Sequence, residues 1–111
     1  MTELAVLADK VGQVSELYAT RNAIERDADW YALKLQEELG ELVSAYLRRD
    51  GRGRAKGEDA KAIARGLADE AADVFAQLLL FCAHNHIDIE AALERKWFSR
   101  LDAHPQKTKT E

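Results

Sequence analysis

The chain has 111 residues, with 47% hydrophobic and 32% charged side chains and a formal net charge of −4. This length suits one domain, and the negative balance argues against a non-specific nucleic-acid binder, which usually carries a basic face. No apolar run reaches the ~18–20 residues that a membrane span needs, and the start lacks a leader-like pattern. With a single cysteine, Cys82, inside an apolar run, we expect a cytoplasmic protein with a buried, inert thiol.

The composition favours helix, because Ala, Leu, Glu, Lys and Arg are common and there are only 6 glycines and 1 proline. Apolar spacings of three and four predict a first helix over about 3–24, with Thr2 as its N-cap. A second helix is expected over about 30–49, capped by Asp27 or Asp29. The apolar stripe expected on the first comprises Leu4, Leu7, Val11, Val14, Leu17 and Tyr18, and on the second Leu35, Leu39, Leu42, Val43 and Tyr46.

A cationic, glycine-punctuated loop over residues 50–57 follows; it is either a lid over an anionic ligand or a solvated charge run. The third helix is expected over about 59–85 and a short fourth from Asp88 to about Leu101. Residues 1–103 would form one helical domain, and 104–111 a disordered polar tail.

Long helices in so short a chain bury little surface within one copy. The fold expected is therefore all-α, a four-helix bundle that a second copy of the chain helps to complete, as a homodimer or homotetramer.

Two pairs of acidic residues occupy matching positions on the second and third helices. At about 100° per residue, Glu38 and Glu41 lie about 60° and 120° from the centre of the stripe at Leu35. Glu70 and Asp73 have the same offsets from Leu67. Packing through these stripes would bring four carboxylates together, with Glu38 and Glu70 closer to the core.

Four neighbouring carboxylates repel one another unless cations intervene. An all-oxygen ligand set favours Mg²⁺, or Mn²⁺, over Zn²⁺, and Mg²⁺ in turn favours a phosphorylated substrate. A di-iron carboxylate site needs Glu-x-x-His, which no glutamate of this chain provides. The remaining alternative is a pair of solvated acidic faces with no ligand.

Other residues near these acids have two interpretations each. Lys34 either contacts phosphate or only pairs with Glu38 one turn on. Trp30 either stacks on a base or anchors the helix start in the core. Gln77 either reads a base or ribose or is a polar boundary residue.

The strings Lys34-Leu-Gln-Glu37-Glu38-Leu-Gly-Glu41-Leu and Asp69-Glu70-Ala-Ala-Asp73-Val resemble the EExxE and ExxD motifs of MazG-like nucleotide pyrophosphohydrolases. The similarity extends over roughly residues 28–98. It implies hydrolysis of a nucleoside triphosphate between the α and β phosphates, giving a monophosphate and pyrophosphate. The departure from the pattern lies after Lys96, where Trp97-Phe98-Ser99-Arg100 stands in place of an Asn-Arg pattern.

Residue roles follow from this resemblance. Those implied for magnesium are Glu38, Glu41, Glu70 and Asp73, while Glu37 would orient or deprotonate the attacking water together with Glu38. Lys96 is implied as a phosphate contact, and Arg100 as a substitute for the missing asparagine. Two rivals stay open: a phosphoribosyl-ATP pyrophosphatase, and a non-catalytic helical module that binds a partner through the first helix.

Overall fold

The computed structural model describes residues 1–53 and 57–103. These residues form three long helices: α1 (Glu3–Asn22), α2 (Ala28–Arg49) and α3 (Ala60–His84). The side chains of Thr2, Asp27 and Asp59 each accept a hydrogen bond from a backbone amide of the first turn. This confirms Thr2 and Asp27 as predicted caps, and Asp59 is a further cap, at the start of α3. Asp27, not Asp29, is the cap of α2.

The fourth helical segment differs from the uniform α-helix that was expected. It consists of α4 (Ile89–Leu93), η1 (Glu94–Phe98) and α5 (Ser99–Ala103), so a π-helical turn interrupts it. Asp88 caps α4 by accepting from the Ala91 amide at 3.0 Å, as predicted. A π turn changes the hydrogen-bond register by one residue, which apolar periodicity over so few residues cannot reveal. The predicted tail 104–111 lies outside the described residues.

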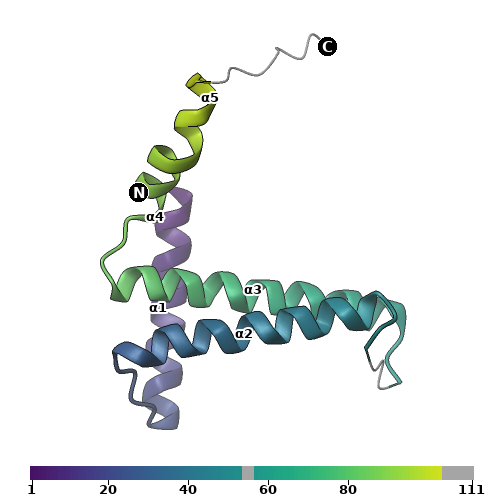
Figure 1. Cartoon of the computed structure of the whole chain (residues 1–111). Helices are drawn as coiled ribbons and strands as arrows, with labels where there is room; N and C mark the ends of the chain where they lie inside the picture. The colour runs from purple at the N-terminus through teal and green to yellow at the C-terminus, as the bar shows by residue number, and fades with distance from the viewer. Residues whose placement is uncertain (54–56, 104–111) are drawn as a thin grey trace.

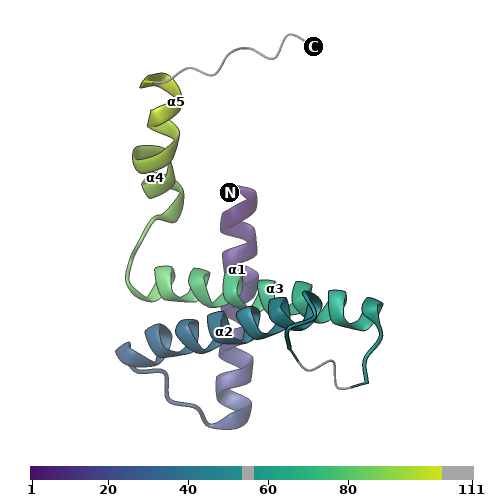
Figure 2. The same cartoon turned by 45° about the vertical axis from the view of Figure 1, so that its right-hand side comes forward.

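The described part of the chain is all-helical, which confirms the predicted fold class. Helices α2 and α3 lie side by side and antiparallel, and α1 crosses them (Figures 1 and 2). The α4–α5 segment leaves the end of α3 and points away from this pair. No described helix is both long and apolar enough to cross a membrane.

The core of the single chain is thin. Its buried apolar residues are Ala19, Ala45, Leu79, Leu80 and Cys82. Much of the predicted stripe of α1 is open, with Val14 and Leu17 each 66% exposed, and Leu39 on α2 is 49% exposed. The radius of gyration is 17.8 Å, against about 13 Å for a compact chain of this length. One copy therefore does not form a closed bundle by itself.

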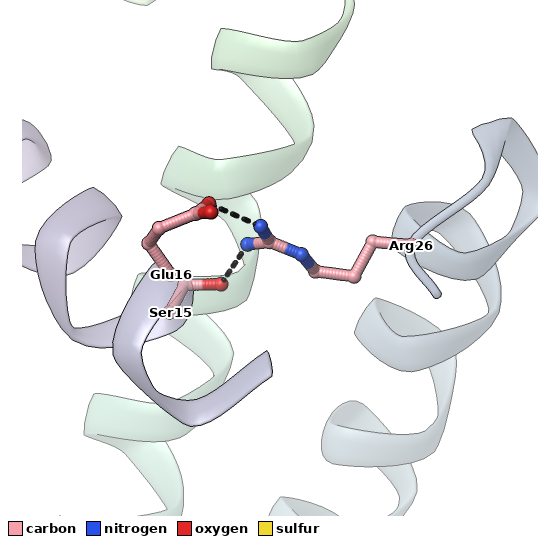
Figure 3. Close-up of polar contacts among 3 residues, drawn as sticks. All are labelled: Ser15, Glu16 and Arg26. Atoms are coloured by element: carbon pink, nitrogen blue, oxygen red, sulfur yellow. Dashed lines mark hydrogen bonds and ion pairs between the residues drawn. The ribbon is translucent and has the colours of Figure 1, made fainter. Parts of the chain in front are cut away.

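The link between α1 and α2 is fastened by Arg26. Its guanidinium donates hydrogen bonds to the Ser15 hydroxyl and to the Glu16 carboxylate, both on α1 (Figure 3). Ala23 ends α1 in the left-handed conformation, with φ at 51°, and the Ile24 amide donates back to Ala19. These bonds fix the direction in which the chain leaves α1 and hence how α1 crosses α2 and α3.

Candidate metal centre and the adjoining cleft

Three acidic side chains meet where α2 packs against α3. Glu38 and Glu41 lie one turn apart on α2, and the packing of the two helices brings Glu70 of α3 beside them. One carboxylate oxygen from each of the three lies within 4.8 Å of the other two. Such a spacing is short enough for a single cation to contact all three oxygens.

Glu38 is the most buried member, with only 8% of its surface exposed. Its Oε1 lies 3.7 Å from the ammonium of Lys34. Its Oε2 is buried and has no hydrogen-bond partner within the described residues. Burial, together with the carboxylates of Glu41 and Asp73, raises the pKa of Glu38 to about 7. In the absence of a cation this carboxylate is therefore costly to ionise.

Glu70 on α3 likewise has a buried carboxylate oxygen without a partner among the described residues and a raised pKa. Its side chain is partly buried, and Oε2 again lacks a partner in the part of the chain that the structure describes. Burial raises the pKa of Glu70, the negative charges of Glu41 and Asp73 raise it further, and Arg48 opposes them. Glu41 and Asp73 are themselves exposed. The order of burial thus agrees with the helical phases, in which Glu38 and Glu70 lie nearer the core.

The donor set fits a hard divalent cation. All three grouped donors are carboxylate oxygens. Two buried oxygens, Oε2 of Glu38 and Oε2 of Glu70, have no hydrogen-bond partner among the described residues and could contact a cation. Asp73 lies outside the tightest group, but its charge acts on both Glu38 and Glu70. Mg²⁺ or Mn²⁺ suits such ligands, whereas the nitrogen and sulfur donors that Zn²⁺ prefers are not part of the group.

Lys34 lies between the acidic cluster and Glu37. Its ammonium donates a hydrogen bond to Glu37 at 2.9 Å, which raises the pKa of Lys34, and lies farther from Glu38. The predicted pairing with Glu38 therefore exists, although Glu37 is the closer partner. Glu37 itself is exposed and is not one of the three grouped carboxylates.

A cleft of about 600 Å³ adjoins the acids, a volume typical of small-molecule sites. Glu38 and Asp73 line it together with three residues singled out in the sequence: Trp30, Lys34 and Gln77. The rest of its wall comes from Ala76 and Leu80 of α3 and from Lys10, Val11, Val14, Ser15 and Tyr18 of α1. Acidic, cationic, aromatic and apolar groups therefore face one space.

Two predicted substrate contacts lie elsewhere in the chain. Lys96 is on η1 and Arg100 is on α5, and neither lines the cleft. The Arg100 guanidinium lies 5.3 Å from the centre of the Trp97 ring. The segment that carries them points away from the α2–α3 pair (Figure 2).

The cationic loop is partly described. Arg52 pairs with Asp50 at 2.8 Å, and the guanidinium groups of Arg49 and Arg52 lie 5.3 and 5.8 Å from the ring centre of Tyr46. Residues 54–56 lie outside the described residues, so the alternatives of a lid and a solvated run both stay predictions.

Two features of the site have no counterpart in the sequence patterns. The α1 wall of the cleft depends on the crossing of α1, and residues such as Lys10 and Ser15 carry no motif. Tyr31 stacks on His84 with ring centres 4.3 Å apart, and Trp30 meets Tyr31 edge-on at 5.1 Å. This aromatic group fastens the start of α2 to the end of α3, next to Trp30 in the cleft.

A smaller cavity of about 170 Å³ lies where the start of α1 meets the link from α3 to α4. The Thr2 hydroxyl donates to Glu90 at 2.7 Å beside it. Cys82, which also lines it, is 5% exposed, and burial raises the pKa of its thiol. The thiol therefore stays protonated and unreactive at neutral pH, as expected from the sequence.

Comparisons of the chain with protein-family models, with curated proteins and with solved structures found no significant match. The family resemblance thus rests on the two acidic motifs.

Proposed function

We propose that this protein is a Mg²⁺-dependent nucleotide pyrophosphohydrolase that cleaves a nucleoside triphosphate between the α and β phosphates. The observation that carries the proposal is the meeting of Glu38, Glu41 and Glu70 beside a cleft, with two buried carboxylate oxygens lacking partners among the described residues. The EExxE and ExxD strings, which resemble the MazG-like motifs, contain the same three residues and Asp73.

Glu38, Glu41, Glu70 and Asp73 would hold the cation. A bound Mg²⁺ would polarise the phosphate oxygens and lower the pKa of a coordinated water. The chain's own residues supply position and charge. Lys34 lines the cleft and its ammonium is available to a phosphate oxygen at the cost of a contact with Glu37. Nucleotidyl transfer depends mainly on such positioning and neutralisation, and no covalent nucleophile is needed.

Glu37 is proposed as the group that accepts the proton of the attacking water. Its carboxylate is exposed and is hydrogen bonded to Lys34, one of the residues that line the cleft.

The reaction is tested by its product. Incubation with a panel of ribo- and deoxyribonucleoside triphosphates and Mg²⁺ is expected to release pyrophosphate and monophosphate, which ³¹P NMR or a coupled pyrophosphate assay detects. Phosphoribosyl-ATP belongs in the same panel, as the substrate of the rival pyrophosphatase. Release of orthophosphate, or no release from any of these compounds, would contradict the proposal.

A second copy of the chain is proposed to cover the open apolar faces. Exposed on α1 outside the cleft wall are Leu7 and Leu17, and on the α4–α5 segment Trp97, Phe98 and Leu101. Large apolar side chains gathered in the open are unfavourable in water, and a homodimer or homotetramer would bury them. Light scattering is expected to give at least twice the 12.5 kDa chain mass. A mass of one chain at micromolar concentration would refute the oligomer and favour a partner of another kind.

A further inference from the structure

Gln77 lies in the wall of the cleft and carries a buried hydrogen-bond acceptor that is not used within the described part of the fold. It lies on α3 one turn beyond Asp73 and lines the cleft with Glu38 and Trp30. Its Oε1 is buried, yet no hydrogen-bond donor reaches it from the described residues. Leaving such an atom unpaired is unfavourable in a folded protein, and most buried polar atoms have a partner. A turn of the terminal amide about its last side-chain bond would bring this oxygen to the cleft, where a ligand with a donor group would supply a partner.

The surroundings of Gln77 indicate the kind of ligand. The acids Glu38 and Asp73 and the cation Lys34 form the polar part of the cleft. Leu80 follows Gln77 along α3, and the apolar and aromatic part of the wall comprises Val11, Val14, Tyr18, Trp30 and Leu80. Gln77 is displaced by roughly 6 Å along the helix from Asp73, in the direction of Leu80. A ligand whose phosphates are held at the acids would thus place the group beyond those phosphates next to Gln77 and the apolar wall.

We propose that Gln77 selects the base of the bound nucleotide, its Oε1 accepting a hydrogen bond from an N–H on the base edge. The inference rests on the proposed function, because it takes the phosphates to lie at the acidic cluster. Aromatic rings such as that of Trp30 suit the face of a base, and a carboxamide suits its edge. The class of substrate is therefore a nucleotide whose base offers an N–H donor towards Gln77.

Gln77 has a specificity role rather than a role in the fold. A side chain that only stabilised α3 would have its oxygen bonded within the chain. Replacing it by Met keeps the length and removes the polar atoms, so the fold should tolerate Gln77→Met. A site built to bond an N–H discriminates against analogues that lack it, because its own buried acceptor is then left unpaired.

The experiment compares natural nucleotides with analogues that lack the donor. The pairs are ATP with purine riboside triphosphate, CTP with 2-pyrimidinone riboside triphosphate, and UTP with N3-methyluridine triphosphate. For the pair containing the best natural substrate, the wild-type protein is expected to favour the natural member by about ten- to a hundredfold in kcat/KM, mainly through KM. In Gln77→Met the natural substrate should lose this advantage, and the ratio within the pair should fall to near one.

Gln36→Met is the matched control, because Gln36 is on α2, is exposed and does not line the cleft. It should keep the wild-type ratio. Equal use of both members of every pair by the wild-type protein would overturn the inference without any variant. So would a ratio that survives in Gln77→Met, or a variant in which only the preference between ribose and deoxyribose changes.

Failure of the proposed function has a different signature. If no nucleotide releases pyrophosphate, calorimetric binding of the same pairs in the presence of Mg²⁺ still measures the ratio. Tighter binding of the natural member, abolished by Gln77→Met, would support base selection by a protein that does not hydrolyse its ligand. Equal affinities within each pair would contradict it.

Discussion

Glu41→Gln is expected to lower kcat/KM for nucleotide hydrolysis at least about a hundredfold while leaving the helices intact. The amide keeps the size of the side chain but replaces a charged oxygen donor in the group formed with Glu38 and Glu70. Glu41 is exposed, and its charge raises the pKa of both neighbours. Its neutralisation therefore relieves repulsion, so activity and stability are predicted to change in opposite directions.

Initial rates of pyrophosphate release and circular dichroism at 222 nm, measured on the same preparation, check this prediction. Asp73→Asn should behave like Glu41→Gln, because Asp73 lines the cleft and acts on the same two carboxylates. Glu25→Gln serves as the control, since Glu25 is exposed in the link between α1 and α2. Full turnover by Glu41→Gln or by Asp73→Asn would show that the reaction does not depend on this cluster.

Glu38→Gln is expected to stabilise the metal-free protein above pH 7, by about 1–3 kcal/mol, while removing most of the stabilisation by Mg²⁺. Burial and the neighbouring acids raise the pKa of Glu38 from 4.5 to about 7. The folded state thus holds a proton that the unfolded state releases between these two pH values. The contribution of Glu38 to the free energy of unfolding without metal is therefore greatest below about pH 4.5, and it is lost as the pH rises to about 7.

Denaturant unfolding in EDTA across this pH range measures the effect. The free energy of unfolding should depend less steeply on pH in Glu38→Gln than in the wild-type protein. Some dependence should remain, because the pKa of Glu70 is raised as well. With millimolar Mg²⁺ at pH 8 the wild-type protein should gain about 1–3 kcal/mol in free energy of unfolding, and Glu38→Gln much less. An equal gain in both proteins would place the ion elsewhere. A destabilised metal-free Glu38→Gln would mean that the ion pair of Glu38 with Lys34 outweighs the cost of burying its charge.

The helices and the two pairs of acidic residues could be predicted from the sequence because both depend on local periodicity. The side chains of Thr2, Asp27, Asp59 and Asp88 cap helices because of their position before an amphipathic run. Helical phase also placed Glu38 and Glu70 nearer the core than their partners, and the structure has the same order.

The remainder depends on how helices cross, which periodicity does not describe. The α1 wall of the cleft follows from the crossing of α1 and from the bonds of Arg26 to Ser15 and Glu16 (Figure 3). The π turn of η1 was likewise not expected. Local pattern therefore predicted that Glu38, Glu41 and Glu70 come together, but not that α1 would complete the cleft beside them.

The central claim, a divalent metal site at the acidic cluster, is tested most directly by anomalous diffraction from crystals grown with Mn²⁺. We expect an anomalous peak at about 2.0–2.2 Å from carboxylate oxygens of Glu38, Glu41 and Glu70, the distance typical of small octahedral divalent ions. Crystals of Glu41→Gln, grown in the same way, should show a weaker peak or none. Fully occupied Mn²⁺ at another place, with these three carboxylates bound only to protein or water, would contradict the claim.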